Sequence, residues 1–235
     1  MTAHSDPPRS RRERPAKPAL TREGIVAAAV EIMRAEGLQK VTMRRLAQQL
    51  DTGPASLYVY VGSTAELHAA ILDELLGTVE SAPAEGSWRQ RLEQVLTRYA
   101  ETLFEHPSLA RAALVARPGG EHYLNLVERL LALLDEGGVA PGQAAWGVDV
   151  LLQYATASAA EQATRAQSPD DAKDAWDALT RALHGASDRT HPQIAALAGP
   201  LLSGAPRERL SWGFQVLING ILHTPTPTTP TRSTA

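Results

Sequence analysis

The sequence predicts an all-α protein that consists of a small N-terminal head and a larger helical body. Apolar residues recur every three or four positions over nearly all of residues 20–223, which is the spacing of one face of a helix. The alternation of apolar and polar residues that is typical of half-buried strands does not occur. A chain of 235 residues with 43% hydrophobic residues can bury a substantial core.

The head has the clearest start and stop signals. Thr21 and Thr42 each precede a helical pattern and can cap its first turn, while Gly37 ends the first pattern. Pro54 opens the third helix, at a position where its missing N–H is not needed. A tight turn at residues 51–53 therefore joins two short helices. The helices of the head are expected at residues 21–36, 43–50 and 54–60.

The rest of the chain is predicted to be a connecting helix and a helical body. Thr64 is expected to cap the connecting helix, and Ser87 the first helix of the body. Residues 192–202 have an ambiguous pattern. Helices of the body are expected at residues 88–106, 108–117, 121–136, 141–166, 172–185 and 206–223. The predicted divisions are a disordered basic arm (1–19), the head (20–64), the connecting helix (65–80), the body (87–223) and a disordered tail (224–235).

Charge divides the chain in the same way. Residues 1–64 carry ten Lys/Arg and six Asp/Glu (+4), whereas residues 65–235 carry 13 and 20 (−7), so the net charge of the whole chain is −3. A basic head on an acidic body indicates that the head, and not the body, meets a polyanion.

Several classes of function find no support in the sequence. The absence of cysteine excludes disulfide and thiolate chemistry. No nucleophile elbow, glycine-rich phosphate loop or His/Asp/Glu cluster at ligand spacing occurs, so we expect no enzyme, no metal and no other cofactor. No apolar run reaches the roughly 18 residues of a membrane span, and no apolar segment follows the N-terminal arginines. We therefore expect a cytoplasmic protein with no membrane partner.

The stretch PASLYVYV places a serine and two tyrosines in a very short helix. Two short helices joined by a tight turn form a helix-turn-helix unit, whose second helix enters the DNA major groove. Leu57 and Val61 are expected to face the head, whereas Ser56 and Tyr60 share another face. Ser56 can bond base edges, and the hydroxyls of Tyr58 and Tyr60 can reach phosphates. Taken alone, the two tyrosines also fit core residues with solvated hydroxyls.

The longer stretch VTMRRLAQQLDTGPASLYVYV resembles the DNA-binding head of the TetR family of repressors. The residues that match the family signature are Thr42, Arg44, Leu46, Ala47, Leu50, Leu57 and Tyr58. The resemblance implies a homodimer on a palindromic operator in double-stranded DNA. The expected DNA-binding residues are Thr42, Arg44, Arg45, Pro54, Ala55, Ser56, Tyr58, Tyr60 and Thr64.

The head departs from the family pattern at two positions. Family members usually have a lysine at the start of the fourth helix, where this chain has Thr64, and a glycine in the turn, where it has Asp51. Without the lysine, one phosphate contact is lost and the salt slope of DNA binding should fall by about one unit. The basic arm RSRRER at residues 9–14 either compensates by lying along a groove or is a solubilising tail.

The body is similar to the ligand-binding and dimerisation domain of the tetracycline-repressor branch of that family. The similarity rests on Ser87-Trp88, on Arg117-Pro118 and on the C-terminal stretch RLSWGFQVLINGIL. It implies that the last helix and residues 144–160 pair with their mates in a four-helix bundle. The expected interface residues of the last helix are Trp212, Gly213, Val216, Leu217 and Gly220, each of which also fits an ordinary core position.

The same similarity predicts a ligand pocket without the drug's own contacts. The groups that hold magnesium-bound tetracycline fall on Val95, Ala113 and Ala116, whose side chains can neither coordinate a metal nor form hydrogen bonds. A small apolar or aromatic effector that releases the repressor from DNA is expected instead. The expected lining is Val95, Tyr99, Leu103, Arg117, Arg129, Trp146, Asp149, Val150, Gln153 and Tyr154.

Two alternatives stay open. Arg117 equally fits a salt bridge near a helix end. The whole chain also fits a helical protein that sequesters a small molecule and whose DNA binding has degraded, because the family pattern is altered at two positions of the head.

Overall fold

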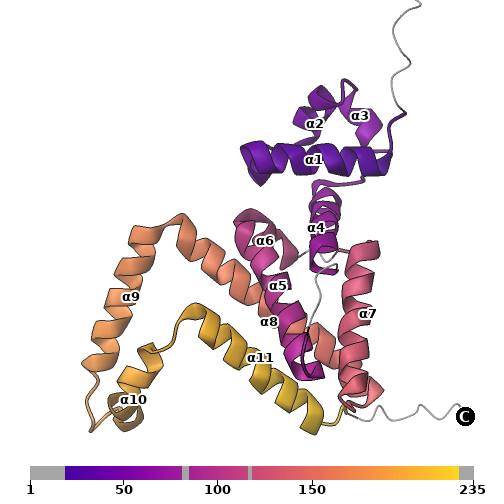
Figure 1. The fold of residues 1–235 in the computed structure, drawn as a ribbon. Coiled ribbons are helices and arrows are strands. Elements are labelled where there is room, and N and C mark those ends of the chain that lie inside the picture. Colours follow the sequence, from indigo (N-terminus) through magenta and orange to yellow (C-terminus); the bar gives the residue numbers. More distant parts are fainter. Residues whose placement is uncertain (1–18, 81–84, 116–117, 228–235) are drawn as a thin grey trace, which may run out of the picture.

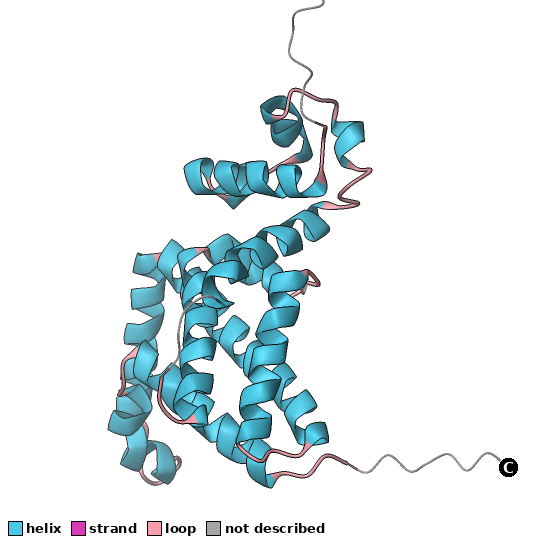
Figure 2. Cartoon of the chain, turned by 45° about the vertical axis from the view of Figure 1, so that its right-hand side comes forward, coloured by secondary structure: helices cyan, strands magenta, loops and turns pink. Residues whose placement is uncertain are grey.

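The computed structural model describes residues 19–80, 85–115 and 118–227, and within them it contains helices and loops but no strand (Figure 2). The all-α prediction is confirmed. The head contains α1 (Arg22–Glu36), a short 3-10 helix (Leu38–Lys40), α2 (Met43–Gln49) and α3 (Pro54–Leu57), and α4 (Thr64–Glu80) follows. The body contains α5 (Trp88–Glu105), α6 (Pro107–Ala113), α7 (Glu121–Glu136), α8 (Pro141–Gln167), α9 (Pro169–His184), α10 (Pro192–Leu202) and α11 (Pro206–His223).

The head and the body lie at opposite ends of α4 (Figure 1). Helices α1–α3 form the head, and α4 leads from it into the body beside α7. Helices α5, α7 and α8 pack against one another, and α6 packs against α8. Helix α11 packs against α8 and α5. Helices α9 and α10 form a hairpin that leans away from the body, and no residue of α9 is buried.

Buried apolar stripes and side-chain caps explain the helices of the head. The Thr21 hydroxyl accepts the Gly24 N–H at 3.0 Å, and the Thr42 hydroxyl accepts the Arg45 N–H at 3.1 Å, as the sequence predicted. Gly37 ends α1 with a φ of 89°, a conformation that favours glycine. The buried stripes of α1, α2, α3 and α4 meet in one core formed by Ile25, Ala29, Ile32, Leu46, Leu57, Leu67 and Ile71.

The structure corrects several element boundaries. Helix α3 ends at Leu57, and residues 58–60 form a turn rather than its last turn. Thr64 is the first helical residue of α4, so the capping hydroxyl is that of Ser63, which accepts the Glu66 N–H at 3.1 Å. Helix α9 begins earlier than expected, at Pro169, because proline suits the first helical position.

Two further segments differ from the sequence-based expectation. Residues 192–202, whose pattern is ambiguous, form helix α10. Helix α6 ends at Ala113, and residues 116–117 of the expected helix lie outside the described part of the chain. Most of the expected arm and tail lie outside it as well. None of the described helices is long and apolar enough to cross a membrane.

Candidate DNA-binding face and ligand pocket

Helix α3 and the turn after it expose polar side chains over a buried anchor. Leu57 and Val61 are fully buried, so they fix this segment to the head. Ser56 is exposed, and Tyr58 and Tyr60 expose 51% and 38% of their surface. Both tyrosines are therefore at the surface of the head, although neither exposes its whole side chain.

The neighbouring residues of the predicted DNA-binding set are also at the surface. Pro54 and Ala55 are exposed at the start of α3, and Thr64 is exposed at the start of α4. Thr42 is exposed as well, although its hydroxyl caps α2. The structure therefore presents α3 and the first turns of α2 and α4 to solvent.

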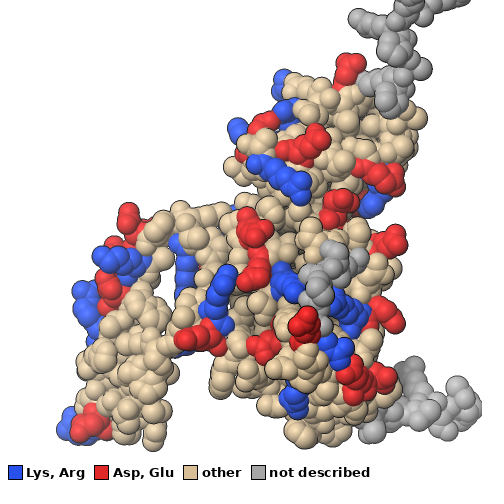
Figure 3. Space-filling view, in the orientation of Figure 1, with Lys and Arg blue, Asp and Glu red and all other residues tan. Residues whose placement is uncertain are grey.

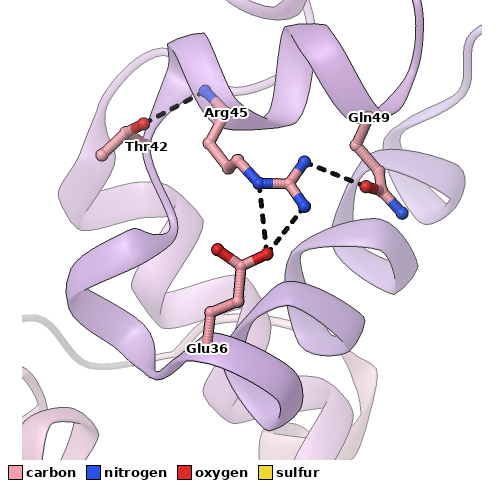
Figure 4. A network of polar contacts seen from close by, with 4 residues as sticks. All are labelled: Glu36, Thr42, Arg45 and Gln49. Atoms are coloured by element: carbon pink, nitrogen blue, oxygen red, sulfur yellow. Dashed lines mark hydrogen bonds and ion pairs between the residues drawn. The ribbon is translucent and has the colours of Figure 1, made fainter.

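The two arginines of α2 have different surroundings. Arg44 is exposed and lines a broad, shallow hollow between α2 and α3 together with Gln48 and Pro54. The Arg45 guanidinium instead contacts Glu36 of α1, with the Nη2–Oε1 distance at 2.7 Å, and donates to the Gln49 side chain at 3.0 Å (Figure 4). In the free protein, Arg45 therefore fastens α2 to α1, and Arg44 is the cation that faces the hollow.

Asp51 occupies a left-handed backbone position in the turn between α2 and α3. Its φ of 48° is a conformation that glycine adopts without strain and that Asp tolerates better than most residues. This geometry explains why the family prefers glycine there. Asp51 also lines the hollow and places a negative charge beside the exposed face.

The folded part of the head is nearly neutral. Residues 19–64 contain five Lys/Arg and four Asp/Glu, so most of the basic excess of residues 1–64 lies before residue 19. Figure 3 shows basic and acidic side chains interspersed over the visible face of the head, without a continuous basic patch. The positive charge that distinguishes this end of the chain is therefore concentrated in the arm, which lies outside the described residues.

A cavity of about 280 Å³ opens in the body between α5, α6, α7 and α8. At its buried end, the Tyr99 hydroxyl lies 2.8 Å from the Thr156 hydroxyl, which donates to the Leu152 carbonyl at 2.8 Å. Because the only proton of Thr156 is used in that bond, Tyr99 is the donor to Thr156. The cavity is lined by Tyr99, Ala113, Leu114, Pro118, Tyr123, Leu152, Gln153, Thr156 and Ala157.

Among the predicted ligand-binding residues that the structure describes, Tyr99 and Gln153 line this cavity and the others do not. Val95 and Leu103 are fully buried on α5 and belong to the core. Arg117 lies outside the described residues.

The other predicted ligand-binding residues lie on α7 and α8. Trp146 and Val150 are exposed on the surface of α8, and Asp149 accepts a hydrogen bond from Gln153 at 2.8 Å. Tyr154 packs edge-on against Phe214 of α11. Arg129 is half-buried on α7.

The sequence-based list missed most of the cavity wall. Thr156 and Ala157 lie three and four residues after Gln153 on α8, so the helical period from Gln153 was a usable signal. Leu114 and Tyr123 come from the end of α6 and the start of α7. Their approach depends on tertiary packing, which has no local signal in the sequence.

The predicted interface residues fall on two sides of α11. Trp212 and Val216 expose 68% and 46% of their surface, and Gly220 is exposed too. Leu217 is half-buried. Gly213, by contrast, faces the chain's own α8, where a Cβ atom would collide with the Tyr154 ring.

Comparisons with known proteins agree with this arrangement. The family model "Bacterial regulatory proteins, tetR family" matches residues 25–71, and "Tetracyclin repressor-like, C-terminal domain" matches residues 80–224. The HTH-type transcriptional repressor DrrR1 of Streptomyces coeruleorubidus is 30% identical over 215 residues, which cover 87% of this chain and 78% of that protein.

Solved structures show the same fold. SCO7704 from Streptomyces coelicor superposes with a TM-score of 0.76 at 57% identity, covering 91% of this chain and 100% of that one. ActR of Streptomyces coelicolor, in complex with actinorhodin, has a TM-score of 0.75 at 35% identity, with 87% and 96% covered. The chain therefore belongs to the TetR family and is a helix-turn-helix transcriptional regulator with a C-terminal ligand-binding domain.

Proposed function

We propose that the protein is a dimeric repressor that binds a palindromic operator through α3 and is released by a small, largely apolar effector. The observation that carries this proposal is that the α3 segment has one buried apolar side and one exposed polar side. Leu57 is fully buried, while Ser56, Tyr58 and Tyr60 are exposed at the far end of the head. A segment built in this way is held rigidly and presents polar groups outward, which DNA reading requires.

Each exposed group has a role that fits its chemistry. Ser56 lies on α3 itself and reads a base edge, because its hydroxyl can donate and accept. The hydroxyls of Tyr58 and Tyr60 and the Arg44 guanidinium bind phosphates. The arm at residues 1–18 adds sequence-independent affinity, since the folded head supplies little net charge.

Exposed apolar side chains on α8 and α11 support a dimer. Trp146 and Val150 of α8 and Trp212 and Val216 of α11 are all at least 42% exposed. Large exposed apolar residues that gather on adjacent helices mark an interaction surface. Pairing of these faces in two copies gives a helical bundle, and operator binding then requires the two α3 segments to stand about 34–36 Å apart.

The lining of the cavity indicates the class of effector. Two tyrosines and several apolar side chains surround the polar groups of Gln153 and Thr156, which suits a flat molecule with few polar substituents. ActR, a relative that binds actinorhodin, supports a small-molecule effector here. Ala113 lines the cavity at the position where the metal-holding histidine of the tetracycline repressors falls, so magnesium–tetracycline is not the effector.

Fluorescence anisotropy on a labelled duplex tests the proposal. The duplex is a palindrome selected from random sequence with the full-length protein, and binding is measured over a salt series. We expect one selected sequence, tight binding by a dimer, and an affinity that falls steeply with salt. Candidate effectors are then screened by the release of this duplex. Failure to select any sequence, with only weak binding, would support the sequestering protein instead.

A further inference from the structure

Helix α7 receives its N-terminal cap from another helix. Gly120 is its N-cap residue and has no side chain to satisfy the first amides of the helix. The Tyr123 N–H, which a capping side chain would normally bind, donates to the carboxylate Oδ1 of Asp73 at 2.9 Å. Asp73 lies on α4, 50 residues earlier in the chain. The carboxylate therefore joins α4 and α7 through a charge-assisted hydrogen bond.

With the Asp73 carboxylate in this position, residue 120 has no room for a side chain. Its φ of −86° and ψ of −178° are open to any residue, so the backbone does not require glycine. A Cβ atom at this position would instead collide with the carboxylate of Asp73. Helix α7 thus lacks a local cap in the place where α4 supplies one.

The bond lies between the effector cavity and the head. Tyr123 lines the cavity together with Tyr99 and Thr156, and Pro118 lines it as well. Gly120, two residues after Pro118, lines a separate hollow together with Asp73 of α4 and Arg22 of the head. Figure 1 shows α4 passing from the head into the body alongside α7. This hydrogen bond is therefore one of the contacts that connect the cavity wall to the helix that carries the head.

We propose that Asp73 is a positioning residue that couples the effector cavity to the DNA-binding head, an inference that rests on the function proposed above. An effector that displaces the first turn of α7 must either move α4 with it or break the bond. Breaking the bond leaves a half-buried carboxylate and a helix-end amide without their partners. Either result changes the relative free energies of the head positions, and this difference is what coupling between two sites requires.

The five tyrosines of the chain allow a direct test by NMR. Labelling with 15N-tyrosine gives one amide signal for each, and single Tyr→Phe variants assign them. Tyr58 and Tyr60 report DNA contact, Tyr99 and Tyr123 report the cavity, and Tyr154 reports the packing of α8 on α11. Spectra are recorded with and without the selected palindromic duplex.

Four variants separate coupling from simple capping. Asp73→Ala removes the bond, and we expect the Tyr123 amide to exchange with solvent about tenfold faster. Asp73→Ala combined with Gly120→Ser gives α7 its own cap without the hydrogen bond to α4, since loss of the carboxylate leaves room for the serine. Asp73→Asn retains an oxygen acceptor. Glu74→Ala removes the next, exposed carboxylate of α4 as the matched control.

In the wild type, in Asp73→Asn and in Glu74→Ala, we expect DNA to shift the signals of Tyr58, Tyr60 and Tyr123 but not that of Tyr154. In the double variant, we expect slow exchange at Tyr123 to return, while DNA shifts only Tyr58 and Tyr60.

Two results would overturn the coupling role. One is a Tyr123 signal that still responds to DNA in the double variant. The other is a wild-type Tyr123 signal that is unmoved while Tyr58 and Tyr60 shift. If neither Tyr58 nor Tyr60 responds, the proposed DNA binding itself fails, and the role of Asp73 fails with it.

Discussion

The DNA-reading face and the effector cavity are built in opposite ways. The face comes mainly from consecutive residues, with Ser56, Tyr58 and Tyr60 spaced around one buried anchor, Leu57. The cavity draws its wall from four helices, and Tyr99 of α5 meets Thr156 of α8 across 57 positions of sequence. A face of the first kind is specified by local pattern, whereas a cavity of the second kind exists only once the body has folded.

The polar groups of the two sites also differ in their energetics. On the face they are exposed, so exchanging one of them costs little stability and changes mainly the contacts made with DNA. In the cavity, the hydroxyls of Tyr99 and Thr156 are buried and bonded to each other. Loss of one buried partner therefore affects folding as well as binding.

The largest expected effect is that of Leu57→Ala, which removes the anchor of the reading face. Leu57 is fully buried, so we expect the free energy of unfolding of the head to fall by about 2–5 kcal/mol. DNA binding should be lost with it, because Ser56 and Tyr58 then have no fixed position. Chemical denaturation followed by circular dichroism measures the change. Val59→Ala is the control, since Val59 is 80% exposed and its loss should cost under about 0.5 kcal/mol.

Tyr99→Phe should produce the next largest change in stability, and it addresses the cavity. It removes the hydrogen bond to Thr156, so we expect the free energy of unfolding to fall by about 1 kcal/mol. DNA affinity of the effector-free protein should stay the same. Tyr154→Phe is the matched control, because the Tyr154 hydroxyl makes a longer bond of 3.3 Å to the Arg209 carbonyl. If both variants lost the same free energy of unfolding, the buried Tyr99–Thr156 bond would contribute no more to stability than the longer Tyr154 bond.

The sequence predicted local features of the fold well. Thr21 and Thr42 cap the starts of α1 and α2, and Gly37 ends α1, all as expected, because caps depend on residues within one turn. The exposed face of α3 followed from the spacing of Leu57 and Val61.

Contacts between helices that are distant in the chain could not be predicted from the sequence. Val95 and Leu103 were placed in the ligand pocket by resemblance, but they are fully buried in the core. The wall residues Leu114 and Tyr123 were missed for the same reason, since they meet α8 only through packing. Arg44 and Arg45 were both predicted to bind DNA from their adjacent positions in the sequence. The structure distinguishes them, because Arg45 forms an ion pair with Glu36 of α1.

That difference between the two arginines of α2 is open to measurement. Arg44→Ala should leave the unfolding temperature unchanged and reduce the salt slope of DNA binding by about one unit, because one phosphate contact is lost. Arg45→Ala should reduce the free energy of unfolding by up to about 1 kcal/mol, since it breaks a partly exposed ion pair with Glu36. Thermal melts and anisotropy titrations of both variants decide the matter. An equal reduction of the salt slope in both variants would show that Arg45 also contacts a phosphate.

The smallest expected effect tests whether the reading face can be improved. Thr64 is exposed at the first position of α4, where the family usually has a lysine. Thr64→Lys should increase the salt slope by about one unit and tighten DNA binding several-fold. It should also lower stability by about 0.3–1 kcal/mol, because a cation at a helix N-terminus opposes the helix dipole. Thr64→Gln is the control for side-chain length without charge, and it should leave the slope unchanged. If the lysine also leaves the slope unchanged, the start of α4 lies away from the phosphates, and the face is confined to α2 and α3.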